Sequence, residues 1–192
     1  HQSTDAIWIA ARVVSGLQEA ISRRLDALHP VVVSFGRIEG GKAFNVIADH
    51  VRLLGTVRCL DLELHAKLPS WIEETVQAIC AGYGGEARVR YRCISPPVHN
   101  DPELTRWGTQ SLGRGVGGER VKEIQPVMGA EDFSILARAV PGMFFFLGIT
   151  PPDEDAHTAP ANHSPLFHIH EPALKYGVRA LTYLAFDYLR RK

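Results

Sequence analysis

Two short stretches combine residue types that can do chemistry. One is Asn162-His163-Ser164-Pro165, and the other places Glu131 and Asp132 directly before Phe133. Between them lies the apolar run 143–148, which is typical of a buried strand. Such a strand fixes the root of the loop that follows it, and the loop lets an imidazole face a cleft. The pattern therefore predicts a metal ligand at His163, with carboxylates near the same end of a sheet.

Each of these residues also has a simpler interpretation. A single loop histidine is more often a surface residue than a ligand, and Glu131 and Asp132 would serve equally well as helix caps. The spacing of His157, His168 and His170 is also typical of solvated loop residues. From these residues alone, a metal ligand and a solvated loop both stay open.

The composition argues against several classes of protein. The 192 residues include 21 basic and 21 acidic side chains, so the formal net charge is zero. We therefore expect no nucleic-acid partner and no membrane-surface role, because both need a concentrated positive field. No apolar run approaches the roughly 20 residues that span a bilayer. The three cysteines show no CxxC spacing, which fits a reducing cytoplasm better than a disulfide framework or a structural zinc site.

Residues 1–95 predict a small α+β module. Hydrophobic periodicity and capping residues predict helices and strands in the order α-β-β-α-β. Adding one strand in front gives the ferredoxin-like β-α-β-β-α-β arrangement, so we expect a truncated module of that kind. The expected helices cover residues 4–24 and 61–80, and the expected strands cover residues 31–38, 45–59 and 86–94.

Residues 96–192 predict part of an α/β domain. Helices are expected over residues 102–112, from Glu131 onward and over residues 171–189, with strands near Val121 and over 143–148. Two strands and three helices do not close a core comfortably. We therefore expect half of an α/β domain whose other half is absent from this chain.

Short motifs in a fixed order carry a family resemblance over nearly the whole chain. Any one of them is weak, but the ordered set is specific. The chain resembles the co-catalytic-metal amidohydrolases and aminoacylases, which include hippurate hydrolases and auxin-conjugate hydrolases. The motifs are VSFGRIEGG from Val33, NVIAD from Asn45, GTVR from Gly55, Pro96-Pro97 with Asn100, GAEDF from Gly129, Pro141-Gly142, and His163-Ser164-Pro165 with Phe167.

The resemblance implies that the two parts of the chain belong to different domains with different roles. Residues 1–95 would form a lid or dimerisation domain, and residues 96–192 the C-terminal portion of an α/β catalytic domain of the zinc-peptidase type. In such enzymes a hydroxide that bridges two divalent ions (Zn, Mn, Ni or Co) attacks an amide carbonyl while a glutamate moves the proton. Most metal ligands and that glutamate lie in the N-terminal half, so the resemblance leaves this chain no catalytic residue and one metal ligand, His163. The chain alone is expected to be inactive, while its parent hydrolyses N-acyl amino acids or small peptides.

The resemblance also implies substrate-binding residues. Asn45 matches an asparagine that reaches the substrate, in some relatives across a dimer, and Arg58 would pair with a substrate carboxylate. Glu131 would orient ligands or substrate, and His1 matches the end of the His-rich entry to the lid. Two simpler readings stay open: Asn45 could satisfy turn backbone, and Arg58 could be an exposed strand residue or an ion-pair partner.

The sequence departs from the family pattern at three positions, so an unchanged substrate preference does not follow. Ala48 stands where proline is usual, and His168 and His170 stand where acidic residues are common. An alternative function is a non-catalytic dimerisation or small-ligand-binding module. Half of an α/β sheet would leave apolar faces and a strand edge exposed, so we expect a homodimer or a higher oligomer.

Overall fold

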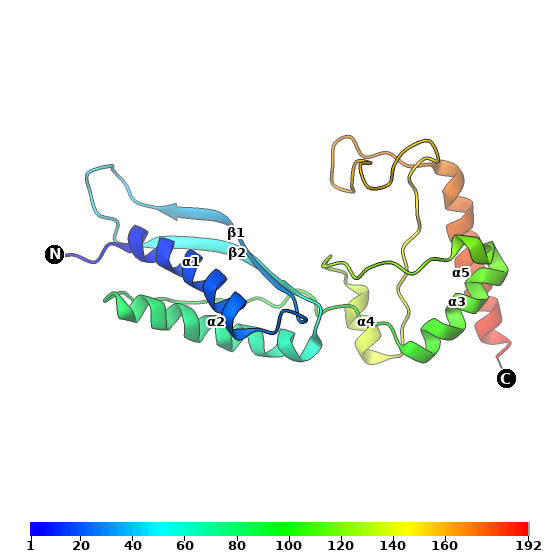
Figure 1. Cartoon of the computed structure of the whole chain (residues 1–192), viewed down its shortest axis with the longest axis horizontal. Coiled ribbons are helices and arrows are strands. Elements are labelled where there is room, and N and C mark those ends of the chain that lie inside the picture. The colour runs from blue at the N-terminus through cyan, green and yellow to red at the C-terminus, as the bar shows by residue number, and fades with distance from the viewer. Residues whose placement is uncertain (192) are drawn as a thin grey trace. The chain divides into compact units, whose positions relative to one another are not determined.

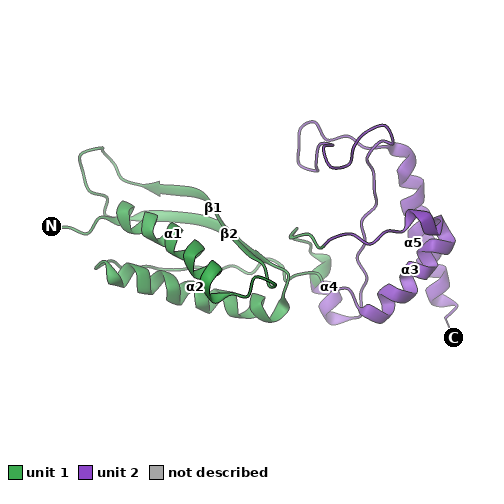
Figure 2. Cartoon of the chain, in the orientation of Figure 1, with its two compact units in different colours: residues 1–98, 126–134 green, residues 99–125, 135–192 purple. Residues whose placement is uncertain are grey.

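The computed structural model describes residues 1–191, which form two compact units (Figures 1 and 2). Unit 1 holds residues 1–98 and 126–134, and unit 2 holds residues 99–125 and those from 135 onward. None of the described helices is long and apolar enough to cross a membrane. The helices and strands are α1 (Ala6–Arg24), β1 (Val31–Gly40), β2 (Val51–Cys59), α2 (Leu62–Gly82), α3 (Pro102–Val116), η1 (Gly118–Arg120), α4 (Phe133–Ala139), η2 (Glu171–Ala173) and α5 (Leu174–Leu189).

Unit 1 is a two-stranded antiparallel ribbon packed against two helices (Figure 1). The ribbon pairs Val31 with Cys59 at one end and Gly40 with Val51 at the other. Both helices begin at an aspartate whose side chain accepts backbone N–H groups, Asp5 for α1 and Asp61 for α2. Their apolar faces meet the ribbon in one core, formed by Ile9, Val13, Leu17, Val33, Cys59, Leu68, Ile72 and Cys80.

The strand predicted over residues 86–94 is wrong as a paired strand, and so the α-β-β-α-β order is not seen. Within the described residues the only sheet is β1–β2, and unit 1 reads α-β-β-α. The alternating burial is nevertheless present, because Ala87, Val89 and Tyr91 are half-buried while Arg88 and Arg90 are exposed, and Ala87 and Tyr91 pack against the core. An alternating pattern shows which side chains are buried. A paired strand also requires a neighbouring backbone segment whose N–H and C=O groups are free to bond with it.

Unit 2 also lacks the predicted strands near Val121 and over residues 143–148 in the part of the chain that is described. The second run instead pairs with a side chain: Asn100 Nδ2 donates to the Phe144 carbonyl, and the Phe144 N–H donates to Asn100 Oδ1, both at 2.8 Å. The helix predicted to break at Gly113 continues to Val116 and ends at Gly117, whose φ of 96° suits a residue without a Cβ.

Small residues let α3 lie close to α5. Gly108, Ser111 and Gly115 are buried on one face of α3. The Ser111 hydroxyl donates to Asp187 Oδ2 at 2.6 Å, and Arg114 Nη2 approaches the same oxygen at 2.6 Å. These two donors hold the pKa of Asp187 below its ordinary value, the Ser111 hydroxyl most of all. Because α3 has no side chain at two of these positions, its distance from α5 depends on glycine.

Gly115→Ala is expected to destabilise unit 2 by about 1–3 kcal/mol, because an added methyl group overpacks this contact. A Cβ at position 115 would lie 2.8 Å from Tyr183 Cγ. Urea unfolding followed by the fluorescence of Trp107 on α3 measures the loss. Gly113→Ala is the matched control: its Cβ would meet nothing closer than Gly118 Cα at 3.7 Å, so we expect no loss there. Equal effects at both positions would contradict close packing at Gly115.

Candidate functional site

His163 occupies a turn in unit 2 with an unusual backbone conformation. Its φ is 71°, and it is the only described residue other than glycine with a positive φ. The left-handed conformation costs a residue with a Cβ about 1–2 kcal/mol. Its imidazole is exposed. Strain of this kind persists where the surrounding chain enforces it, and it is concentrated at binding and catalytic sites. The structure therefore presents His163 to a possible ligand, while its role as a metal ligand stays a prediction.

The loop that carries His163 is tied at its base and braced inside. The His170 N–H donates to the Ile149 carbonyl at 2.7 Å, which closes the loop. The His168 ring contacts the Leu166 carbonyl at 3.1 Å and Glu154 Oε1 at 2.8 Å. The Leu166 carbonyl first, and then Glu154, raise the pKa of His168 above its ordinary value. Of the departures from the family pattern, His168 thus has a structural role through its side chain, whereas the bond at His170 is made by its backbone.

The His168 ring is expected to titrate above about pH 6.5, the ordinary histidine value. A raised folded-state pKa means that its contacts stabilise the loop fully below that pH and lose this contribution as the pH rises through the raised value. NMR titration of the ring protons measures the pKa. Glu154→Gln should lower it part of the way, since the Leu166 carbonyl remains, while Asp153→Asn, at the neighbouring exposed acid, should leave it unchanged. A pKa of His168 at or below 6.5 in the wild-type chain would contradict the contacts of its ring with Leu166 and Glu154.

Arg58 and the Glu131 stretch meet in unit 1. Arg58 lies on β2, and its Nη1 donates to the Met128 carbonyl at 2.7 Å across 70 residues of sequence. Glu131 sits three residues further along. Its backbone carbonyl accepts from the Ser134 hydroxyl at 2.6 Å, and its Oε1 accepts from the Phe133 N–H at 3.4 Å. Of the two acidic residues that the sequence offered as caps, Glu131 is thus the one whose side chain accepts a backbone N–H at the start of α4 in the described structure.

Arg58→Ala is expected to release residues 126–134 from the ribbon at a cost of about 1 kcal/mol, the usual value of one hydrogen bond in a partly solvated place. Hydrogen exchange should become faster over residues 126–134 and stay unchanged in α1. Arg52→Ala is the control, because Arg52 lies on the same strand and donates no side-chain hydrogen bond within residues 1–191. Faster exchange in both variants would show that the ribbon itself had loosened.

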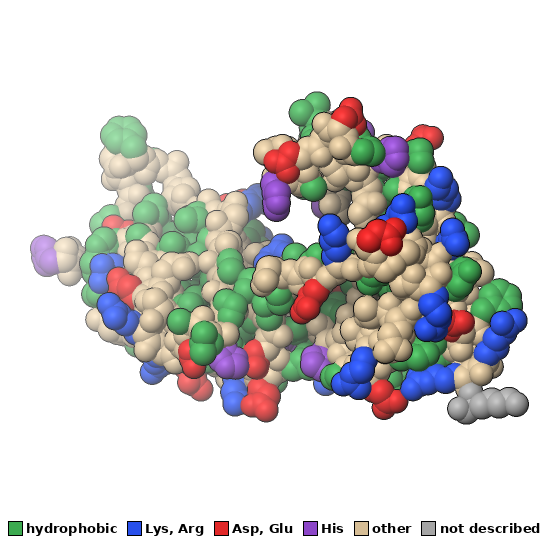
Figure 3. Space-filling view, turned by 45° about the vertical axis from the view of Figure 1, so that its right-hand side comes forward, with side chains coloured by type: hydrophobic (Ala, Val, Ile, Leu, Met, Phe, Trp, Pro, Cys, Tyr) green, Lys and Arg blue, Asp and Glu red, His purple; other side chains and the backbone are tan. Residues whose placement is uncertain are grey.

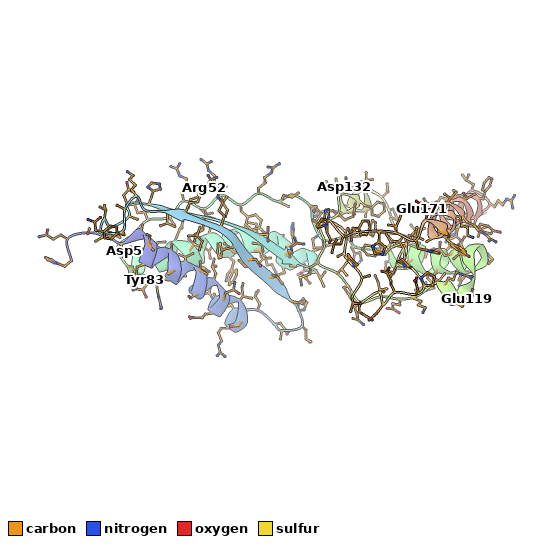
Figure 4. All side chains as sticks on the ribbon, turned by 90° about the horizontal axis from the view of Figure 1, so that it is seen from above. Asp5, Arg52, Tyr83, Glu119, Asp132 and Glu171 are labelled. Carbon is orange, nitrogen blue, oxygen red and sulfur yellow. The ribbon has the colours of Figure 1, made fainter. Side chains whose placement is uncertain are left out.

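Asn45 and His1 lie away from Arg58. Asn45 belongs to the loop beyond the Gly40–Val51 end of the ribbon, whereas Arg58 is one residue from the other end. The seven residue steps from Val51 to Arg58 span about 23 Å at strand geometry. The Asn45 side chain is exposed and, within the described residues, does not bond the turn backbone. His1 is exposed at the N-terminus, ahead of α1 (Figure 1). Asp5, which caps α1, lies near Tyr83 at one end of unit 1 (Figure 4).

The described residues contain no group of three or more His, Cys, Asp or Glu side chains that could hold a metal ion. His163 is thus at most one ligand, and catalytic metal sites usually have three from the protein. Basic and acidic side chains are interspersed on the face in Figure 3. Two contacts could not be predicted from the sequence, because each joins residues that are distant along the chain. They are the contacts of Arg58 with Met128 and of Cys93 with His65.

Comparison with known proteins shows one family throughout. The family model Peptidase family M20/M25/M40 matches residues 7–187. A probable hydrolase of Synechocystis sp. is 44% identical over 98% of this chain and 48% of its own length. An IAA-amino acid hydrolase of Arabidopsis thaliana is 34% identical over 98% of this chain and 43% of its own.

A solved structure agrees. The Bacillus subtilis YXEP protein, a dinuclear metal-binding M20 peptidase, matches 97% of this chain and 47% of its own at a TM-score of 0.78 and 28% identity. The mixture of helices with a small sheet is therefore that of M20 structures. The chain spans about half the length of the curated relatives it matches. It belongs to peptidase family M20/M25/M40.

Proposed function

We propose that this chain forms the lid and the C-terminal catalytic portion of a metal-dependent hydrolase that cleaves the amide bond of N-acyl amino acids or small peptides. The observation that carries the proposal is membership of a hydrolase family over residues 7–187. Relatives named for amino acid conjugates support an amide substrate, and a neighbour named for two bound metals supports divalent cofactors. Residues 1–95 are assigned to the lid and residues 96–192 to the catalytic portion.

The residues of this chain do not fit a complete metal site. One exposed imidazole, His163, is presented in a strained turn, and the described residues offer no further cluster of ligands. We therefore assign His163 to a site whose other ligands lie in polypeptide outside these 192 residues. On this proposal the chain alone is inactive, and the identity of the metal, Zn, Mn, Ni or Co, is set by the whole site.

Two features of unit 1 support a role in substrate binding. A guanidinium has five N–H donors, so Arg58 can bond the Met128 carbonyl and still pair with a substrate carboxylate. Glu131 lies on the segment that Arg58 holds, and we propose that this segment borders the substrate. His1 lies before α1, at the ribbon end nearer to Asn45, and no contact in the described structure adds to its proposed role.

The position of Asn45 supports a homodimer. A substrate the size of an N-acyl amino acid does not span the length of the ribbon, so Asn45 and Arg58 of one chain would not bind the same molecule. The loop around Asn45 exposes Phe44 fully, and Val46 and Ile47 by more than half. An exposed apolar loop tip is suited to contact another chain. We therefore propose that Asn45 acts at the site of a second subunit.

A non-catalytic association module is the second candidate. The edge of β2 away from β1 and the extended residues 86–94 have no strand partner in the described structure, which favours association through a sheet edge. This candidate predicts self-association without hydrolysis, even in the product of the complete reading frame.

Metal analysis and hydrolysis assays on two proteins test the proposal. The two are this chain and the product of the complete reading frame that encodes it, each assayed against a panel of N-acyl amino acids and dipeptides. We expect about two divalent ions per chain and turnover from the longer protein, and neither from the 192 residues. Stoichiometric metal and turnover by this chain alone would overturn our assignment of ligands. An inert, metal-free longer protein would favour the association module.

A further inference from the structure

A cysteine and a histidine lie side by side in unit 1, away from the residues assigned to the hydrolase. Cys93 lies on the extended segment beyond α2, and its Sγ is 3.6 Å from Nε2 of His65 in the first turns of α2. Cys93 is exposed. This pair has no part in the core, since neither residue belongs to the buried cluster of unit 1.

The three cysteines of the chain differ in their surroundings. Cys59 and Cys80 are buried, and burial raises the pKa of both thiols, which keeps them protonated and shielded. Cys93 alone combines access to solvent with an imidazole at contact distance. Reactive cysteines are those whose thiolate is favoured by a neighbouring base and reachable by a reagent. Only Cys93 meets both conditions.

We propose that Cys93, paired with His65, is a modification site for soft electrophiles and hydroperoxides. His65 Nε2 accepts the thiol proton, which leaves a thiolate beside an imidazolium. With a hydroperoxide, the sulfur attacks one oxygen, an S–O bond forms and the O–O bond breaks. The departing oxygen takes the proton from His65 and leaves as water or an alcohol. Sulfur loses two electrons to the peroxide, and the product is a sulfenic acid.

The charged and titratable groups near the Cys93–His65 pair also bear on whether a thiolate can form there. Asp61 caps α2 and Glu63 lies in its first turn, and their carboxylates oppose a further negative charge at this end of the helix. The Asp61 carboxylate is already engaged by the Leu64 N–H at 2.7 Å and by His29 at 3.2 Å, and these contacts lower its pKa. Tyr91, two residues before Cys93, has a raised pKa and stays neutral at physiological pH. His65 is therefore the base in contact with the thiol.

Alkylation by iodoacetamide, followed by peptide mass mapping, tests the proposal on the full chain. At pH 7 we expect Cys93 to react about 5–10-fold faster than N-acetylcysteine, with Cys59 and Cys80 protected. With hydrogen peroxide and dimedone, a reagent that traps sulfenic acids, the label should fall on Cys93 alone.

A matched pair of variants distinguishes the effect of the His65 base on Cys93 reactivity from the effect of solvent exposure alone. His65→Gln should slow Cys93 to the rate of N-acetylcysteine. His50→Gln, at an exposed histidine elsewhere in unit 1, should change nothing. A wild-type Cys93 no faster than N-acetylcysteine would overturn the proposal whether or not His65→Gln folds. So would an unchanged rate in a folded His65→Gln, recognised by continued protection of Cys59 and Cys80. Neither result bears on the hydrolase proposal, which uses other residues.

Discussion

His163→Ala in the complete enzyme is expected to lower kcat/KM on N-acyl amino acids by at least about 100-fold, because under the proposed function it removes a metal ligand, a larger loss than the 10- to 100-fold effect of losing a residue that only orients one. Metal content should fall with activity. The expectation rests on an exposed imidazole that the chain holds in a left-handed turn. Initial rates and metal analysis on the same preparation measure both effects.

Two variants separate chemistry from folding at this position. His163→Gly removes the imidazole from a backbone conformation that glycine adopts freely, so activity should be lost while the thermal midpoint stays equal or rises. His157→Ala makes the alanine change at another exposed histidine of the same loop and should leave kcat/KM within about 3-fold. Activity retained in His163→Gly would refute the ligand role, because the loop is then intact and its imidazole absent.

The helices could be predicted from sequence because their signals are local. Asp5, Asp61 and Asp101 each precede a helix and accept backbone N–H groups within the next three residues. The first predicted helix accordingly agrees with α1. The last predicted helix agrees with η2 followed by α5, although neither has a side-chain cap. The glycines after Leu112 misled the prediction, since Gly115 stays in the helix because Tyr183 occupies the place of its missing side chain.

The strands could not be predicted with equal success. Residues 86–94 alternate in burial and residues 143–148 are apolar, but strand pairing depends on a partner that such patterns do not specify. At Phe144 the partner is the side-chain amide of Asn100, 44 residues away. The candidate site likewise has one feature that depends on local sequence and one that depends on tertiary contacts. A turn at His163 follows from Asn162 and Pro165 nearby, whereas the contact of Arg58 with Met128 depends on the tertiary fold.

Leu17→Ala is expected to destabilise unit 1 by about 3 kcal/mol, within the 2–5 kcal/mol usual for this change in a packed core. Leu17 on α1 is 1% exposed and belongs to the cluster that joins both helices to the ribbon. A loss of this size is a large part of the roughly 5–15 kcal/mol that holds a domain folded. Urea unfolding followed by the fluorescence of Trp8 and Trp71, one on each helix, measures it.

The control is a leucine outside the core. Leu28 is 85% exposed, so Leu28→Ala should change stability by less than about 0.5 kcal/mol. Leu68→Ala, at a residue of α2 that is also 1% exposed, should match Leu17→Ala, because both side chains close the same core from different helices. A cost below about 1 kcal/mol at Leu17 with a full cost at Leu68 would mean that α1 is not part of the cooperative core. The ribbon would then depend on α2 alone, although α1 contacts both of its strands.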